Sequence, residues 1–250
     1  MFDPTAEKLL PDLTVREELV LLARTLWREG YDDHLAGHIT IKLDDGSLLC
    51  NPWLLLWNEL RPRDLIRIDL DGNRLEGEWP VPPGIPLHLE LHKARGDVGV
   101  AVHSHPRWGT IWADLGQVPP CHDQSSALGG GEVAVVDEYA GPVNDADSAR
   151  AAIEKMGGAD MALLAHHGVF VLGKSVRAAH QRAVALEWRC RVAWQVAAAS
   201  HAIQSGAEAP TELPAFARQR LGRSDGEGFI GFWEAMARQE LLADPSLLEG

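Results

Sequence analysis

Histidines at the ends of two apolar segments are the residues of this sequence best suited to chemistry. His103 and His105 stand two positions apart directly after an apolar run, and His166 and His167 close a second apolar run further along the chain. On a strand, side chains two positions apart project from the same face, so His103 and His105 can grip one ion. Imidazole binds divalent zinc, manganese and iron. If only one pair were present, we would interpret its histidines as residues that merely end a strand. Two such pairs together favour a metal site.

A further histidine pair lies on a predicted helix. The segment 87–95 carries His88 and His92, which share a helix face because they are four residues apart. The arrangement differs from the His-Glu-x-x-His of zinc proteases, since Glu90 follows His88 by two positions and points to another side. We expect His92 to be structural, whereas His88, beside a Pro-Gly loop, can either pack in the core or reach a site.

Charge and composition restrict the partners of the chain. The formal net charge of −13 and the lack of a basic stripe argue against nucleic acid or an anionic membrane as the main partner. No apolar run approaches the length of a membrane span, and residues 1–20 lack the pattern of a secretory signal. The cysteines are odd in number and scattered, which suits a reducing compartment; they are Cys50, Cys121 and Cys190. We therefore expect a cytoplasmic protein.

Helices and strands are expected to alternate around these histidines. The first helix begins after Thr14, has Glu17 at the capping-box position and ends at Gly30. Strands are expected at 38–43, 47–50, 65–70, 98–102, 133–136 and 162–165, the last continuing past Gly168 through 169–172, and helices at 87–95, 108–115, 147–156 and 176–200. We predict one α/β domain over residues 1–250 with a mixed sheet, and a C-terminal tail (about 205–250) that packs on the body or on a neighbouring subunit.

The motifs, taken together, resemble the class II aldolase/adducin family. The resemblance covers roughly residues 14–200 and rests on these segments in this order: Ala36-Gly-His-Ile-Thr, Asn51-Pro-Trp, Leu87-His, Ala94-Arg-Gly-Asp-Val, His103-Ser-His and His166-His-Gly. The tail pattern Phe232-Trp-Glu-Ala-Met resembles the adducin-like branch. The resemblance implies a three-layer α/β/α fold around a central, mainly antiparallel sheet, assembled as a homotetramer with sites at subunit interfaces.

The resemblance also implies roles for individual residues. One divalent ion per chain (zinc, manganese or iron) would be held by His103, His105 and His167, with His166 turned to the interior or placed behind the ligands. Candidates for proton transfer and substrate orientation are His38, His88, His122 and Asp123, and candidates for substrate contact are Gly37, Asn51 and Gly84. Three neutral imidazoles would leave the ion its double charge and an open position, so that it acts as a Lewis acid.

Several positions depart from the sugar-phosphate aldolases of that family. Where those enzymes carry Ser-Ser-Glu or Ser-Ser-Asp, this chain has Pro82, Pro83 and Gly84, and prolines offer a phosphate neither a hydroxyl nor an N–H. The family's asparagine in the first loop is replaced by His38, and its proton-donating tyrosine falls near Asp123. The departures argue against a phosphorylated sugar as substrate, and the usual carboxylate base is missing.

These observations predict a metal-dependent carbon–carbon lyase that acts on a small, unphosphorylated hydroxy or oxo acid. Decarboxylation and retro-aldol cleavage share a metal-bound enolate, and decarboxylation needs only an acid to protonate it, which suits a chain without the glutamate. Two alternatives stay open. One is a non-haem iron oxygenase on the same fold. The other is an adducin-like protein that serves interaction only, against which the set of three converging histidines argues.

Overall fold

The computed structural model describes residues 9–137, 145–203, 210–222 and 231–249. Its helices are α1 (Val15–Arg28), α2 (Pro86–Ala94), α3 (Arg107–Asp114), α4 (Gln124–Ala127), α5 (Ala146–Met156), α6 (Val176–Ile203), α7 (Ala215–Leu221) and α8 (Phe232–Ala243), with a 3₁₀ turn η2 (Pro62–Asp64). Its strands are β1 (His38–Lys42), β2 (Leu48–Cys50), β3 (Ile66–Ile68), β4 (Arg74–Glu76), β5 (Val100–Ser104), β6 (Val133–Val136), β7 (Met161–Leu164) and β8 (Gly168–Gly173).

The strands form one sheet of eight in the order β4-β3-β2-β1-β5-β8-β7-β6. Neighbouring strands are antiparallel except for the parallel pair β6 and β7 at one edge. β7 and β8 form a hairpin, so the expectation that 169–172 continues the preceding strand is wrong. The chain reverses there because the backbone of His166 has a φ of 57°, in the left-handed region.

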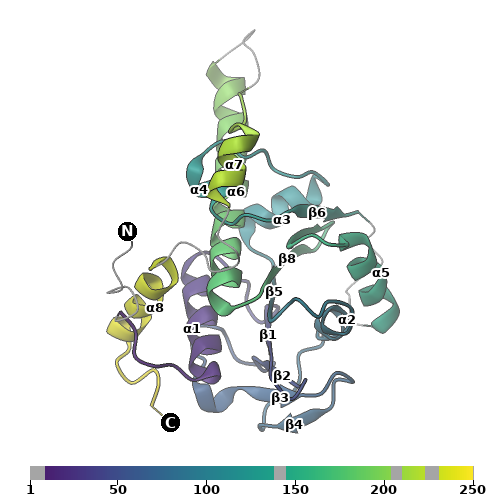
Figure 1. Cartoon of the computed structure of the whole chain (residues 1–250), viewed down its shortest axis with the longest axis vertical. Coiled ribbons are helices and arrows are strands. Elements are labelled where there is room, and N and C mark those ends of the chain that lie inside the picture. The colour runs from purple at the N-terminus through teal and green to yellow at the C-terminus, as the bar shows by residue number, and fades with distance from the viewer. Residues whose placement is uncertain (1–8, 138–144, 204–209, 223–230, 250) are drawn as a thin grey trace.

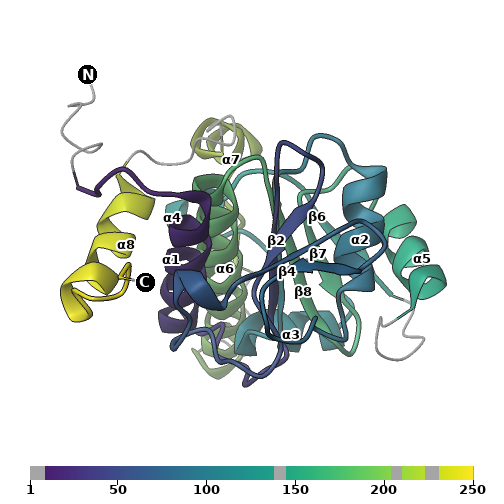
Figure 2. The same cartoon turned by 90° about the horizontal axis from the view of Figure 1, so that it is seen from below.

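Helices cover both faces of this sheet and make three layers (Figures 1 and 2). α1 and α6 cover one face with α8 packed against them, and α2 and α5 cover the other face. The long helix α6 runs past the end of the sheet (Figure 1). The three-layer α/β/α fold with a mainly antiparallel sheet is thereby confirmed.

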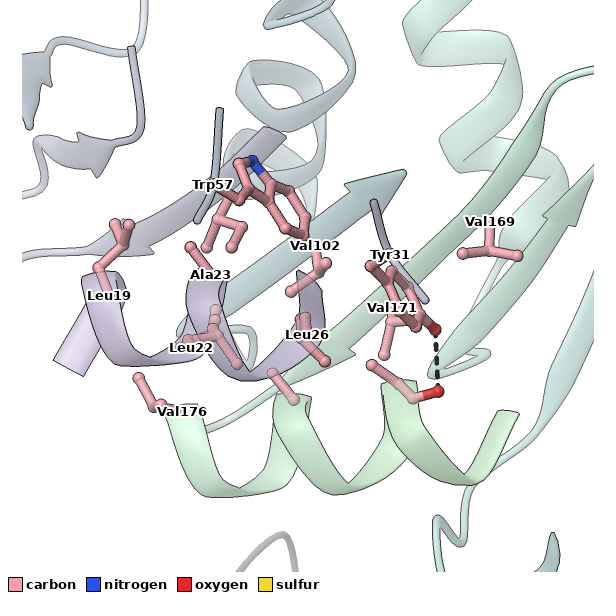
Figure 3. Packing of buried hydrophobic residues seen from close by; sticks show 14 of the residues in the cluster. Leu19, Leu22, Ala23, Leu26, Tyr31, Trp57, Val102, Val169, Val171 and Val176 are labelled. Carbon is pink, nitrogen blue, oxygen red and sulfur yellow. Dashed lines mark hydrogen bonds between the residues drawn. The ribbon is translucent and has the colours of Figure 1, made fainter. Parts of the chain in front are cut away.

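The larger core fills the space between the sheet and the helices α1 and α6 (Figure 3). Leu19, Leu22 and Leu26 of α1 recur at helical spacing, and all are fully buried. The Tyr31 hydroxyl, just after α1, donates a hydrogen bond of 2.8 Å to the Ala183 carbonyl on α6. This bond anchors on α6 the start of the loop that leads from α1 to β1.

Alternation along β5 and β8 decides which side chains reach the opposite face of the sheet. Val102 and Val171 belong to the core under α1 and α6, whereas Ala101 and Phe170 belong to the core beneath α2 and α5. His103 follows Ala101 by two positions, so its side chain lies on the face covered by α2. The first metal-ligand candidate therefore shares a face with the helix that carries His88 and His92.

The C-terminal helix α8 packs against the body of its own chain. Trp233 and Ala237 of α8, and Leu247 beyond it, are buried in the larger core. The Glu240 carboxylate pairs with the Arg28 guanidinium of α1 at 2.5 Å. By contrast, Phe216 on α7 is exposed.

The cysteines are all buried as free thiols. Burial raises the pKa of the Cys50 thiol far above its usual value, so this group packs as a small apolar side chain. Within the residues described, no helix combines the length and the apolar character needed to cross a membrane.

Candidate metal centre

His103 and His38 face the same space from neighbouring strands. They are partners in the antiparallel register of β5 and β1, and their ring centroids are 5.5 Å apart. Nδ1 of His103 lies 2.9 Å from the carbonyl oxygen of Val169, which can only accept, so this nitrogen carries the proton and donates. The lone pair on Nε2 of His103 is then left for another partner.

His105, just beyond β5, is held by an acidic residue from the loop between α1 and β1. Its Nδ1 atom is hydrogen-bonded to the Asp33 carboxylate. Its Nε2 atom is buried and has no hydrogen-bond partner in the described part of the chain. Burial alone would raise the pKa of Asp33, but hydrogen bonds from His34 and His105 hold that pKa below its usual value. A carboxylate behind a ligand histidine fixes its tautomer and raises its basicity.

Sequence reasoning missed Asp33. Its one signal was a place in a polar loop, Tyr31-Asp-Asp-His, between the first helix and the first strand. Asp33 meets His105 across 72 positions of sequence, and a contact over that distance leaves no local periodicity from which it can be read.

His167 enters the centre from the turn between β7 and β8. Its backbone N–H donates to the Leu164 carbonyl at 3.0 Å and closes the turn. The preceding residue, His166, has an exposed side chain whose Nδ1 lies 3.8 Å from Oδ1 of Asp114. The expectation that His166 turns to the interior is therefore wrong, because it lies at the tip of a left-handed turn that carries its side chain outward.

The structure brings His103, His105 and His167 together at one point. Their ring centroids are between 4.7 and 5.0 Å apart, and one ring nitrogen of each lies within 4.8 Å of the other two. Gly168 permits this approach, because a Cβ atom there would lie 2.4 Å from Cδ2 of His105. The predicted ligand set thus forms a cluster that can close around one ion.

The chemistry of this cluster fits a divalent ion. Burial lowers the pKa of His103 far below its usual value and that of His167 to about 4. The rings of His103 and His167 are then neutral at pH 7, and neutral imidazole is the form that coordinates a metal ion. The unpartnered Nε2 of His105 costs free energy in a buried place, and an ion would supply the missing interaction.

Behind the centre, α2 contributes a buried, hydrogen-bonded pair of histidines. The Thr40 hydroxyl lies 2.8 Å from Nδ1 of His88 and 2.9 Å from Nε2 of His92. A hydroxyl has one hydrogen to give, so at most one of these imidazoles accepts from Thr40 and at least one donates to it. His88 also contacts the His38 ring edge-on, with centroids 5.9 Å apart. His88 therefore supports His38 from behind, while Gly84, just before α2, packs against the same ring.

Gly37 and Asn51, the predicted substrate contacts, hold the start of β1 in place. Oδ1 of Asn51 accepts from the Ile39 N–H at 2.6 Å, and its Nδ2 donates to the Gly37 carbonyl at 3.2 Å. The Trp57 indole N–H donates to the same carbonyl at 3.3 Å. Because the backbone uses both ends of the Asn51 amide, this side chain fixes the segment that presents His38.

Asp123 and His122 have their contacts in another part of the chain. Asp123 caps α4, and its Oδ1 accepts from the Ser126 N–H and from the Trp188 indole N–H, each at 3.1 Å. Nδ1 of His122 lies 3.1 Å from the Thr211 carbonyl oxygen. None of these contacts involves the clustered histidines.

Comparison with known proteins places these features in a family. Residues 17–194 match the Class II Aldolase and Adducin N-terminal domain. A 5-methylthioribulose-1-phosphate/5-deoxyribulose-1-phosphate aldolase of Rhodospirillum rubrum is 34% identical over 71% of this chain and 82% of its own. A 3,4-dihydroxyphthalate decarboxylase of Arthrobacter keyseri is 29% identical over 76% of this chain and 81% of its own. An L-fuculose 1-phosphate aldolase structure from Glaciozyma antarctica, 20% identical, shares the fold with a TM-score of 0.79 over 99% of this chain and 100% of its own.

The family match covers more than half of the chain, and it spans the strands and turns that carry the clustered histidines. The relatives include both aldolases and decarboxylases, so they support a lyase. The chain belongs to the class II aldolase and adducin family.

Proposed function

We propose that this protein is a divalent-metal-dependent carbon–carbon lyase, most simply a decarboxylase, that acts on a small, unphosphorylated hydroxy or oxo acid. The observation that carries the proposal is the convergence of His103, His105 and His167. Hydrogen bonds from Nδ1 to the Val169 carbonyl and to the Asp33 carboxylate fix the tautomers of His103 and His105. The aldolase and decarboxylase relatives support it, because both reactions break a carbon–carbon bond next to an oxygen-bearing carbon.

In this proposal the clustered histidines hold the ion and the groups behind them keep the ligands in place. When bound, the ion polarises a substrate oxygen and stabilises the negative charge that develops as the carbon–carbon bond breaks. The Val169 carbonyl and the Asp33 carboxylate each accept a hydrogen bond from Nδ1 of a ligand histidine. This leaves Nε2 of His103 and of His105 directed to the ion without a change of tautomer.

His38 is our candidate for orienting the substrate and for proton transfer to the carbon that loses its carboxyl group. Its ring lies beside His103, with His88 behind it. Burial lowers the pKa of His38 to about 3, so the ring is neutral at pH 7. A neutral imidazole accepts a hydrogen bond at one nitrogen and donates at the other, so it can pass a proton from water to the substrate.

The loop before α2 favours a substrate without phosphate. Pro82 and Pro83 have no N–H and no hydroxyl, and the Pro82 carbonyl already accepts from the Ile85 N–H at 3.2 Å. Across residues 82–84 the loop thus presents a phosphate with at most the N–H of Gly84.

Metal content of the purified protein, measured by elemental mass spectrometry, tests the proposed centre. We expect about one ion per chain in the wild type and none in His167→Ala. His166→Ala is the matched control, because His166 is the neighbouring imidazole but points outward, and it should keep the ion. A screen of hydroxy and oxo acids for release of CO₂ or an aldehyde then follows. Stoichiometric metal in His167→Ala would contradict the ligand assignment.

The same measurement separates the alternatives. Iron in place of zinc or manganese, together with oxygen uptake during turnover, would favour the non-haem iron oxygenase. Protein that takes up no metal even after incubation with these ions would favour a role in interaction only.

We further propose that the chain assembles as a homotetramer with shared centres. Trp188 and Trp194 are two-fifths exposed on α6 and offer apolar surface for such contacts. Assembly would give Asp123 and His122 access to the histidines of a neighbouring copy. Light scattering tests this, and a monomer would remove both residues from the catalytic candidates.

A further inference from the structure

A glycine beside the centre is matched to the imidazole that packs on it. A Cβ atom built on Gly84 would lie 2.3 Å from Cε1 of His38 and 3.0 Å from its Nδ1. The first distance is shorter than any ordinary contact between a Cβ atom and a neighbour. The backbone of Gly84 does not have a positive φ. The His38 ring, and not the backbone conformation, therefore requires a glycine at this position.

The His38 ring has little room to move away. His103 and His88 contact it from two directions, with centroids 5.5 and 5.9 Å away, and the residue is 5% exposed. The Asn51 amide holds the backbone on both sides of His38. A side chain at position 84 and an imidazole at position 38 therefore compete for the same space.

The occupant of that space decides the charge beside the ion. His38 is buried among other imidazoles, and an imidazole brings no negative charge to this place. Of the described acidic side chains, none joins the histidine cluster as a ligand, and Asp33 lies behind His105, where its charge is engaged by hydrogen bonds. An acidic side chain reaching in from position 84 would add a negative charge next to the substrate position.

We propose that His38 and Gly84 form a matched pair that makes the centre selective for substrates that bring their own carboxylate to the ion. The inference rests on the metal-dependent function proposed above and deepens it by naming the group that is recognised. A dication surrounded by neutral imidazoles attracts an anionic substrate without repulsion from a protein carboxylate. His38 can in addition donate an N–H hydrogen bond to that substrate carboxylate.

The size match is tested in metal-free protein by thermal unfolding in the presence of a chelator. Gly84→Ala should lower Tm by ~3–10 °C, the usual effect of overpacking by one carbon in a protein of this size. In a His38→Ala background the same substitution should cost nothing or raise Tm, because the imidazole space is vacated. Gly96→Ala is the control, since a Cβ atom there meets nothing within 4 Å. Equal effects of Gly84→Ala in both backgrounds would overturn the pairing.

The charge argument is tested by placing an acid or its neutral isostere at position 84. Two double variants, His38→Ala/Gly84→Glu and His38→Ala/Gly84→Gln, differ in one charge and not in size. Each is loaded with Co²⁺, and the visible absorption of the ion is titrated with lactate and with hydroxyacetone, which differ in a carboxylate and a ketone. We expect the wild type and the glutamine variant to prefer lactate, and the glutamate variant to lose about tenfold or more of that preference through repulsion between like charges ~6 Å apart.

Each outcome decides one part of the inference. Equal lactate preference in the glutamate and glutamine variants would overturn the selectivity, even if the size match holds. A protein that binds no Co²⁺ would refute the proposed metal centre and the selectivity with it. Unfolding of the metal-free variants would still decide separately whether His38 and Gly84 are matched.

Discussion

Removal of the carboxylate behind His105 perturbs the centre without touching a ligand. In Asp33→Ala the hydrogen bond to Nδ1 of His105 is lost, so the ring is free to rotate and to exchange tautomers. In Asp33→Asn the amide oxygen still accepts that hydrogen bond, but the negative charge is gone. We therefore expect both variants to bind the ion less tightly, with the alanine variant more strongly affected.

The magnitude follows from the position of Asp33. Loss of such an outer partner costs about 10–100-fold in metal affinity, which corresponds to about 1.4–2.8 kcal/mol. The Asp33 side chain keeps 27% of its surface exposed, so water screens part of its charge. We expect the metal affinity to fall about tenfold in Asp33→Asn, where only the charge is lost, and about a hundredfold in Asp33→Ala, where the hydrogen bond is lost as well.

The assay is competition for Zn²⁺ between the protein and a chromophoric chelator. Asp32→Asn is the matched control, because Asp32 is the neighbouring carboxylate and is exposed, whereas the hydrogen bond to His105 comes from Asp33. Cooperative unfolding of the metal-free variants at a temperature above that of the assay shows that the fold is kept, which separates a loss of affinity from a loss of fold. A wild-type Kd in Asp33→Ala would refute the reasoning that this carboxylate orients a ligand.

Three further substitutions probe buried positions elsewhere in the fold. Burial raises the pKa of Glu187 to about 7. Its contribution to the free energy of unfolding is therefore full below about pH 4.5 and is lost as pH rises to about 7. In urea unfolding, Glu187→Gln should reduce the change in the free energy of unfolding between about pH 4.5 and pH 7 by up to ~3 kcal/mol. A wild-type dependence of this free energy on pH in the variant would contradict the prediction. His180→Leu removes two buried ring nitrogens without partners among the described residues; we expect a gain of about 1 kcal/mol in thermal or urea unfolding, and a clear loss would argue for an unseen partner. Gly37→Ala presses a Cβ atom to within 2.5 Å of the Trp57 ring and should cost about 1–3 kcal/mol in the same assay, whereas Gly96→Ala should cost little.

Most of the regular elements could be predicted from local pattern. The capping box of Thr14 and Glu17 opens α1 as expected, and the helix predicted at 176–200 corresponds to α6, Val176–Ile203. These predictions succeed because a capping side chain and a repeat of apolar residues act within one or two turns of the same helix. The turn at His166 was missed because a short apolar run gives no sign of whether the next run continues it or pairs with it.

The three histidines of the candidate site were predictable, but the residues that support them were not. His103, His105 and His167 followed from spacing and from the family resemblance, and the structure places them within reach of one ion. The carboxylate of Asp33 was not found, and Asp123, predicted to be near the chemistry, caps α4. A helix cap and a catalytic acid use the same residue type, so sequence alone does not separate them.

By itself, the sequence determined the residue types that can bind an ion, the face that each presents on its own strand, and the family fold that carries them. Only the tertiary structure decided which of these side chains meet. The pairing of β1 with β5 put His38 opposite His103, and the packing of α2 on that face brought His88 and Gly84 to the same ring. The physical reason is that such contacts join residues far apart in the chain, where close packing and not local periodicity decides which neighbour fits.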